Sequence, residues 1–270
     1  MYYEFYRLTE APFNITPDPR FLFLSDLHQE ALDHLHYGIE DRKGFIQLTG
    51  EVGCGKTTLC RRLFEQLDDR YITALIFNPM LSESQLLRAI LRDFGVETKT
   101  STRSVNYERL NDFLIQATSQ GQLAVVVIDE AQNLPFEMLE NLRLLSNLET
   151  DTHKLLQIIL IGQPELRDKL NVRSLRQLRQ RITVRYHLGP LNEEETGRYL
   201  QHRISTAGGR GVPFFDRGAV RRVYRYSGGI PRLINAVADK ALLGGFVAQS
   251  NQITRRMVKR AEKELEGVFS

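Results

Sequence analysis

Apolar positions follow two different spacings along the first 190 residues of the chain. Short, nearly unbroken apolar runs of strand length stand at 45–48, 71–77, 123–128, 155–161 and 183–188. Between these runs, apolar residues recur every three or four positions, as they do from Leu27 to Ile39 and from Met138 to Leu148. Apolar strands that alternate with amphipathic helices are typical of a parallel sheet with helices on both faces, so we predict an α/β fold.

Beyond Gly189–Pro190 the strand-like runs stop and helix-start signals take their place. These signals are Asn192 with Glu195 three residues later, Asp216, Pro231 and Thr254. We therefore predict a first domain over residues 1–190 and a smaller helical domain over residues 191–270.

The first 25 residues follow neither spacing. They are rich in proline and aromatic residues, namely Pro12, Phe13, Pro17, Pro19, Phe21 and Phe23. This composition predicts an extended N-terminal arm over residues 1–25 that lies on a surface, and we assign it to the first domain, with Ser25 capping the helix that follows.

Composition restricts the class of protein only broadly. The 270 residues are 42% hydrophobic and 26% charged with a net charge of +3, which is ordinary for a soluble globular chain and neither demands nor excludes a nucleic-acid partner. No apolar run approaches the roughly 20 residues that cross a bilayer, and the start lacks the pattern of a signal peptide. Two cysteines, Cys54 and Cys60, fit a reducing cytosol better than a disulfide framework.

A glycine-rich loop after the first strand carries the clearest chemistry. The sequence GEVGCGKTT at 50–58 fits G-x-x-x-x-G-K-[ST] and stands between a predicted strand and a predicted helix. Its residues are Gly50, Glu51, Val52, Gly53, Cys54, Gly55, Lys56, Thr57 and Thr58. Such loops turn backbone N–H groups toward phosphates, while the lysine reaches the β- and γ-phosphates and the threonine hydroxyl binds Mg²⁺. We expect Lys56 to reach the β- and γ-phosphates of ATP and the Thr57 hydroxyl to bind its Mg²⁺.

A second motif stands at the end of the apolar run at 123–128, where Asp129 and Glu130 follow directly. Side chains at the carboxyl end of a parallel strand reach the ligand crevice of such folds. There Asp129 would hold Mg²⁺ and Glu130 would orient and deprotonate the attacking water. Two acids in tandem favour hydrolysis that drives mechanical or assembly work.

Three further positions are candidates for sensing or completing the site. Gln163 follows the strand run at 155–161, and we expect it to contact the attacking water or the γ-phosphate. An arginine cluster at 173–185 offers Arg181 first, and Arg179 second, as a finger that reaches a neighbouring subunit's γ-phosphate. A nucleic-acid contact strip is the open alternative for this cluster. In the helical domain the turn GGIPR places Arg232 at a helix start, where it could also touch the γ-phosphate.

The combination GEVGCGKTT, VVVIDEAQNLP, LIGQPEL, LRQRI and SGGIPRLIN resembles the ExeA-type AAA+ ATPases of bacterial secretion and pilus biogenesis. The N-terminal arm is similar to theirs as well. The resemblance implies an αβα P-loop AAA+ nucleotide-binding domain followed by a helical lid. It also implies ATP-driven work as a homo-oligomer with inner-membrane secretion or pilus-assembly components, with Lys56, Asp129, Glu130 and Arg232 in the roles above.

One departure leaves alternatives open. Fuller members of that family continue into a membrane span and a peptidoglycan-binding domain, and this sequence shows neither. The chain therefore resembles short members of pilus or exopolysaccharide export systems, or the ATPase domain of a longer protein. Transposition regulators of the TniB and TnsC type share the same core, so DNA stays open as a less favoured partner. We expect a cytoplasmic chain, with a peripheral position at the inner membrane as an open option.

Overall fold

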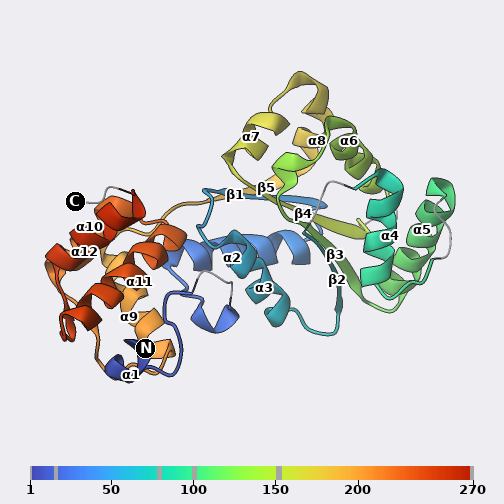
Figure 1. Cartoon of the computed structure of the whole chain (residues 1–270). Helices are drawn as coiled ribbons and strands as arrows, with labels where there is room; N and C mark the ends of the chain where they lie inside the picture. The colour runs from blue at the N-terminus through green and yellow to red at the C-terminus, as the bar shows by residue number, and fades with distance from the viewer. Residues whose placement is uncertain (1, 15–17, 78–80, 99–101, 150–153, 268–270) are drawn as a thin grey trace. The chain divides into compact units, whose positions relative to one another are not determined.

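The computed structural model describes residues 2–14, 18–77, 81–98, 102–149 and 154–267 (Figure 1). Its contacts divide the chain into two compact units. The sheet unit comprises His28–Gly50 and Leu59–Leu188, and the helical unit comprises Met1–Leu27, Glu51–Thr58 and Gly189–Ser270. Pro17 of the predicted arm lies outside the described residues.

A parallel sheet of five strands forms the centre of the sheet unit. Its strands are β1 (Phe45–Gly50), β2 (Tyr71–Ile76), β3 (Leu123–Ile128), β4 (Leu156–Gly162) and β5 (Ile182–Leu188). They lie in the order β2-β3-β4-β1-β5, and every pair is parallel. Each of the five apolar runs became a strand, so the α/β prediction is confirmed.

Helices connect the strands and cover both faces of the sheet (Figure 1). They are α2 (Asp26–Glu40), α3 (Lys56–Gln66), α4 (Glu83–Asp93), α5 (Arg103–Ser119), α6 (Phe136–Leu145), α7 (Pro164–Leu170) and α8 (Arg176–Arg181), with 3₁₀ turns η2 (Ala131–Asn133) and η3 (Arg173–Leu175). Local chemistry sets several of their starts. At α4, for example, Ser82 and Gln85 form a reciprocal capping box.

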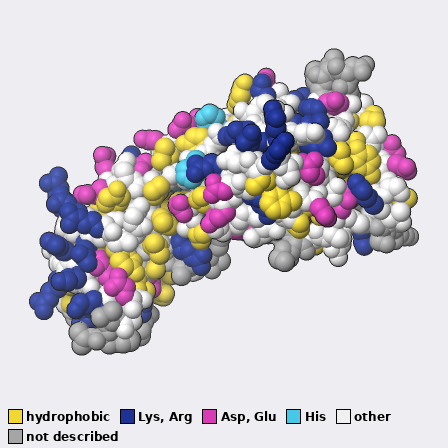
Figure 2. Space-filling view, turned by 90° about the horizontal axis from the view of Figure 1, so that it is seen from above, with side chains coloured by type: hydrophobic (Ala, Val, Ile, Leu, Met, Phe, Trp, Pro, Cys, Tyr) yellow, Lys and Arg dark blue, Asp and Glu magenta, His cyan; other side chains and the backbone are white. Residues whose placement is uncertain are grey.

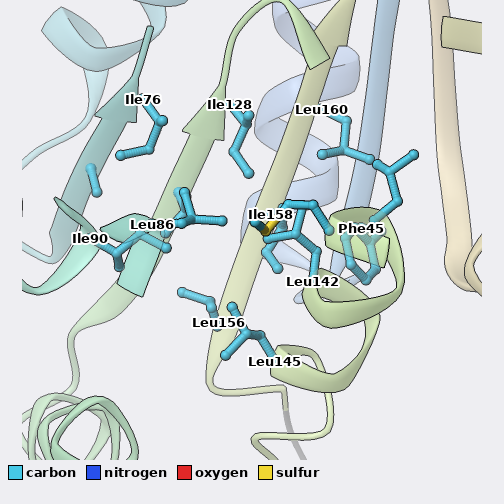
Figure 3. Close-up of a cluster of buried hydrophobic side chains, with 14 of the residues drawn as sticks. Phe45, Ile76, Leu86, Ile90, Ile128, Leu142, Leu145, Leu156, Ile158 and Leu160 are labelled. Atoms are coloured by element: carbon cyan, nitrogen blue, oxygen red, sulfur yellow. The ribbon is translucent and has the colours of Figure 1, made fainter. Parts of the chain in front are cut away.

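Successive strand residues point to opposite faces, which explains why the runs are continuously apolar. On one face Phe45, Ile158 and Leu160 pack with Leu142 and Leu145 of α6 (Figure 3). Truncating a fully buried leucine in such a core costs about 2–5 kcal/mol of folding free energy.

On the other face of the sheet, α2 approaches β1 closely. A Cβ on Gly38 would lie 2.6 Å from Cδ1 of Ile46, so only glycine allows this approach. The central strands β1, β3 and β4 are therefore buried on both sides.

The helical unit contains a four-helix core with short additions. Its elements are α1 (Tyr2–Tyr6), η1 (Pro19–Phe21), α9 (Glu193–Thr206), β6 (Phe214–Phe215), α10 (Arg217–Ser227), α11 (Pro231–Val247), β7 (Gln252–Ile253) and α12 (Arg255–Leu265). Asn192 and Glu195 form the expected capping box of α9, and Asp216 caps α10. Within the described ranges, none of the helices combines the length and apolar content needed to cross a bilayer.

The N-terminal arm is part of the core of this helical unit. Tyr6 is fully buried, and its hydroxyl donates to the Leu242 carbonyl at 3.0 Å. Arg203, also buried, donates from Nε to the Pro12 carbonyl at 2.5 Å and packs 4.5 Å above the Phe21 ring. Burial lowers the pKa of Arg203, and the arm's carbonyls and aromatic rings offset the desolvation of its charge.

Three features differ from what the sequence pattern suggested. The arm packs into the helical unit, not on the surface of the first domain, and its first residues form helix α1. Residues 51–58, which we placed in the first domain, also group with the helical unit. The parallel pair β6–β7 was not foreseen because strands of two residues leave no periodic signal.

Candidate functional site

The phosphate loop joins the end of β1 to the start of α3, as its sequence predicts. Two of its glycines adopt left-handed backbone angles, with φ of +86° at Gly53 and +96° at Gly55. Residues with a Cβ rarely adopt these angles, so glycine at both positions follows from the shape of the loop. This is the curl that turns successive N–H groups inward toward an anion.

Lys56 lies at the first position of α3 and is 6% exposed. Its Nζ donates to the Glu51 carbonyl at 2.9 Å, which holds the ammonium group on its own loop. Thr57 follows it in the first helical turn. A glycine-rich curl, a helix N-terminus and a lysine are together the donor set that phosphates require, so these residues fit a nucleoside triphosphate.

Arg232 of α11 lies against the phosphate loop inside the helical unit. Its backbone N–H donates to the Gly53 carbonyl at 3.3 Å. A Cβ added to Gly53 would lie 2.5 Å from Cβ of Arg232, so no other residue fits between loop and helix. The turn before α11 is equally tight, since a Cβ on Gly229 would lie 1.8 Å from the Leu191 carbonyl oxygen.

The carboxyl end of β3 carries the two acids in different environments. Asp129 is 4% exposed, and its carboxylate accepts from the Glu130 N–H at 2.9 Å. Glu130 has a φ of +53°, a conformation that costs a non-glycine residue energy. This strain falls on the residue that we expect to act as the base.

Two glutamines hold the Glu130 carboxylate. Oε2 of Glu130 accepts from Nε2 of Gln132 at 2.5 Å and from Nε2 of Gln163 at 3.2 Å. Gln132 in turn accepts from the Gln163 N–H at 3.1 Å. Because β4 lies beside β3, the turn after β4 brings Gln163 to the acid. The absence of a side chain at Gly162 makes space for Gln132, since a Cβ at position 162 would lie 2.8 Å from Oε1 of Gln132.

Lys169 of α7 supports the same turn. Its Nζ donates to the carbonyls of Gln132 at 2.8 Å and Leu134 at 2.5 Å, and burial lowers its pKa. Sequence reasoning missed both Gln132 and Lys169. The sequence offers one signal for Gln132, which is an amide two positions after Glu130, the expected base. No neighbouring residue indicates a role for Lys169.

The two candidate finger arginines lie at the end of α8 and differ in how firmly they are held. Arg181 donates from Nη1 to the Arg143 carbonyl at 3.0 Å, to Oγ of Ser146 at 2.6 Å and to Oδ1 of Asn147 at 2.7 Å. Arg179 donates to Oδ1 of Asn171 at 3.2 Å. The guanidinium of Arg181 thus also ties α8 to the loop after α6.

The two groups of residues can perform complementary chemistry. Lys56 and the loop N–H groups are of the kind that can bind phosphate oxygens, and oxygen donors such as those of Thr57 and Asp129 are of the kind that suits Mg²⁺. Glu130, fixed by two amide donors at a strand end, can accept a proton from water.

Comparisons with known proteins agree with this chemistry. The family model described as an AAA domain matches residues 39–170. General secretion pathway protein A of Aeromonas hydrophila is 45% identical over 269 residues, which is 99% of this chain and 49% of that protein. The chain therefore spans about half the length of this curated relative.

Solved structures of AAA+ proteins share the fold. Cdc6p from Pyrobaculum aerophilum has a TM-score of 0.69 at 16% identity, and the match covers 94% of this chain and 70% of the Cdc6p chain. ORC2 from Aeropyrum pernix has a TM-score of 0.66 at 17% identity, over 95% and 72%. A RuvB mutant of Thermotoga maritima has a TM-score of 0.60 at 19% identity, over 90% and 71%. At such identities the likeness shows the fold alone.

The relative from the secretion pathway carries more weight, because its identity extends through the sheet unit, the phosphate loop and the helical unit alike. The resemblance to ExeA-type proteins is thereby confirmed. The chain is therefore similar over nearly its whole length to general secretion pathway protein A, and its residues 39–170 match the AAA domain family.

Proposed function

We propose that this chain binds ATP with Mg²⁺ and hydrolyses it to drive assembly or export in a bacterial secretion, pilus or polysaccharide system. The observation that carries the hydrolytic part is Glu130. It follows Asp129 at the end of a buried strand, adopts a strained backbone conformation and is held by Gln132 and Gln163. A protein that only bound nucleotide would have no need to fix a second acid in this way.

Each residue has a defined task in the proposed reaction. The phosphate loop and Lys56 bind the triphosphate. Thr57 and Asp129 would hold Mg²⁺, which would supply positive charge against the phosphates. Glu130 positions the attacking water and takes its proton. Gln163 and Gln132 both donate hydrogen bonds to Oε2 of Glu130. Gln163 thereby aligns the base with the end of β4.

Arg232 would sense the γ-phosphate. Its support is the direct packing of Arg232 on Gly53, which makes the start of α11 part of the loop's surroundings. A phosphate that reshapes the loop would therefore shift the start of α11.

We propose further that the active form is a homo-oligomer in which an arginine at the end of α8 reaches a neighbour's phosphate. Arg181 was the first choice from the sequence. Its three acceptors on the loop after α6 would compete with that role, while Arg179, with one amide acceptor, is less constrained.

The secretion setting is supported by the curated relative and by the N-terminal arm that the sequence shares with such proteins. The relative is about twice as long as this chain, so its partners are proposals for this protein. A DNA-bound regulator remains the less favoured alternative, since the similar structures solved with DNA share only the fold.

Replacing Glu130 by Gln tests the hydrolytic role. We expect steady-state turnover to fall about 100-fold or more, because the proton acceptor is lost, while ATP binding by a fluorescent analogue stays intact. Glu137→Gln, an exposed acid in the first turn of α6, is the matched control and should keep full turnover. Normal turnover in the Glu130→Gln protein would mean that another residue is the base.

A further inference from the structure

The exposed sides of two helices in the helical unit are almost entirely basic. The exposed cations are Arg217, Arg221 and Arg225 on α10 and Arg255, Arg256, Lys259, Arg260 and Lys263 on α12. We call this set the basic face. Figure 2 shows Lys and Arg side chains gathered on the left of the view, where Figure 1 has α10 and α12.

The two helices lie side by side, so their basic stripes join. Arg222 of α10 donates from Nε to Oε1 of Glu262 of α12 at 2.7 Å and from Nη2 to Oε2 of the same carboxylate. Glu262 is 3% exposed. Nearer the helix starts, a Cβ on Gly218 would lie 3.4 Å from Cβ of Arg255. This seam uses one arginine and one buried acid, and leaves the other cations facing solvent.

The charge on these helices is large for this chain. Together α10 and α12 contain nine Arg or Lys residues and two Glu, whereas the whole chain has a net charge of only +3. Arg221 pairs with Glu193 at 3.3 Å and Arg260 with Glu264 at 3.4 Å. The other six cations of the basic face have no carboxylate within 4.0 Å among the described residues.

Much of this clustering works against the helices that carry it. Like charges four positions apart on a helix destabilise it, and the basic face repeats that spacing at Arg217 and Arg221, at Arg256 and Arg260, and at Lys259 and Lys263. A set of charges that opposes its own helices is best explained by an anionic partner.

We infer that the basic face docks the helical unit onto the surface of an anionic phospholipid bilayer. Headgroup phosphates need only positive charge spread over an area, and two adjoining helices supply that. Base readout in nucleic acid also uses amide side chains, and single strands are bound by exposed aromatic rings. Every exposed residue of α10 is an arginine, and Tyr224 and Tyr226 are partly buried. The basic face thus offers positive charge without the amide side chains and exposed aromatic rings that those two kinds of nucleic-acid recognition use.

The strength of such an attachment follows from its charge. Each Lys or Arg near an anionic bilayer raises partitioning by about five-fold. The attraction fades beyond roughly 8 Å at physiological ionic strength, so it is strongly salt-dependent. The inference goes beyond the proposed ATPase function, and binding of lipid does not require ATP turnover.

Vesicle sedimentation tests this surface with the full chain. The probe is vesicles of equal parts phosphatidylglycerol and phosphatidylcholine, with pure phosphatidylcholine as the neutral reference. The double variant Arg256→Glu, Arg260→Glu removes two cations one helical turn apart on α12. The control variant Arg88→Glu, Arg92→Glu makes the same change at the same spacing on α4, where Arg88 and Arg92 are also exposed. The pairs are matched further, since Arg260 pairs with Glu264 and Arg92 with Asp93.

We expect the unchanged protein and the α4 variant to bind the anionic vesicles and not the neutral ones. The α12 variant should lose at least about 25-fold in partitioning, which corresponds to two cations, while its ATPase rate stays unchanged. An equal loss in both variants, or no binding by the unchanged protein, would overturn the inference. So would duplex DNA that binds through Arg256 and Arg260 and displaces the protein from the vesicles. Loss of turnover in Glu130→Gln bears only on the ATPase function.

Discussion

The phosphate loop and the acidic turn after β3 are built in opposite ways. The loop is a continuous stretch of nine residues whose shape depends on left-handed glycines and whose ligands are mainly backbone N–H groups. The acidic turn is made of side chains from separate segments. Glu130, Gln132, Gln163 and Lys169 meet there through hydrogen bonds between 2.5 and 3.2 Å.

The two regions should therefore lose function through different kinds of substitution. A backbone-made site fails when the chain cannot adopt its angles, whatever the side chains are. A site made from side chains keeps its shape but loses alignment when one hydrogen bond is removed. Substitutions should therefore affect binding in the loop and turnover in the acidic turn.

The largest effect is expected from Gly53→Ala. The residue has a φ of +86°, and the new Cβ would lie 2.5 Å from Cβ of Arg232. If the loop loses two N–H bonds to phosphate, each worth about 1.5–3 kcal/mol, ATP affinity falls at least roughly 100-fold. Gly211→Ala is the control, because Gly211 has a φ of +82° and a Cβ there would meet no atom of the described residues within 4 Å. It should lose about 1–2 kcal/mol of stability and no ATP affinity by calorimetry.

A smaller effect, confined to turnover, is expected from Gln132→Ala. The variant removes a hydrogen bond to the Glu130 carboxylate, so kcat should fall roughly 10-fold or more. KM should change less than about two-fold, because the residue touches the base and not the phosphate loop. Asn133→Ala, an exposed amide one residue along, should leave both constants unchanged. A rise in KM at constant kcat would instead assign Gln132 to binding.

The smallest change is expected at Cys54, a side chain inside the backbone-made loop. Burial raises the pKa of this thiol above its usual value, so the fold favours the uncharged form and the reactive thiolate appears only at a higher pH than in a free cysteine. With Cys60→Ala leaving Cys54 as the one thiol, iodoacetamide labelling at pH 8 should be slower than that of free cysteine and should accelerate as the pH rises further. Mass spectrometry follows the labelling.

The same experiment separates the side chain from the backbone. Cys54→Ala should keep ATP affinity within about two-fold, since the loop binds phosphate through N–H groups. Complete alkylation should block ATP binding, because the added group enters the curl. Unchanged affinity after complete labelling would mean that the residue lies clear of the nucleotide.

Much of the fold was readable in advance because its signals are local. The apolar run at 123–128 became β3 with the same bounds, and Asn192 with Glu195 formed the predicted capping box of α9. The phosphate loop was equally local, since glycine spacing encodes its angles. The relative in the secretion pathway confirms the family that these motifs suggested.

Long-range partners were not readable. Nothing near Lys169 indicates that its ammonium group would cap the turn carrying Glu130, 39 residues earlier in the chain. The arm was equally opaque, because its contacts with Arg203 and Leu242 join residues about two hundred positions apart. Prolines and aromatic rings without a period gave no reason to expect a buried core segment.

The sequence by itself determined the strands, the helix starts, the phosphate loop and the pair Asp129 and Glu130, because spacing and backbone preference act over a few residues. Only the tertiary structure decided that two glutamines hold Glu130, that Arg232 packs on Gly53 and that α10 and α12 merge their charges into one face. Those contacts depend on which strands and helices become neighbours. That choice is made by the packing of the whole core, which no short stretch of sequence contains.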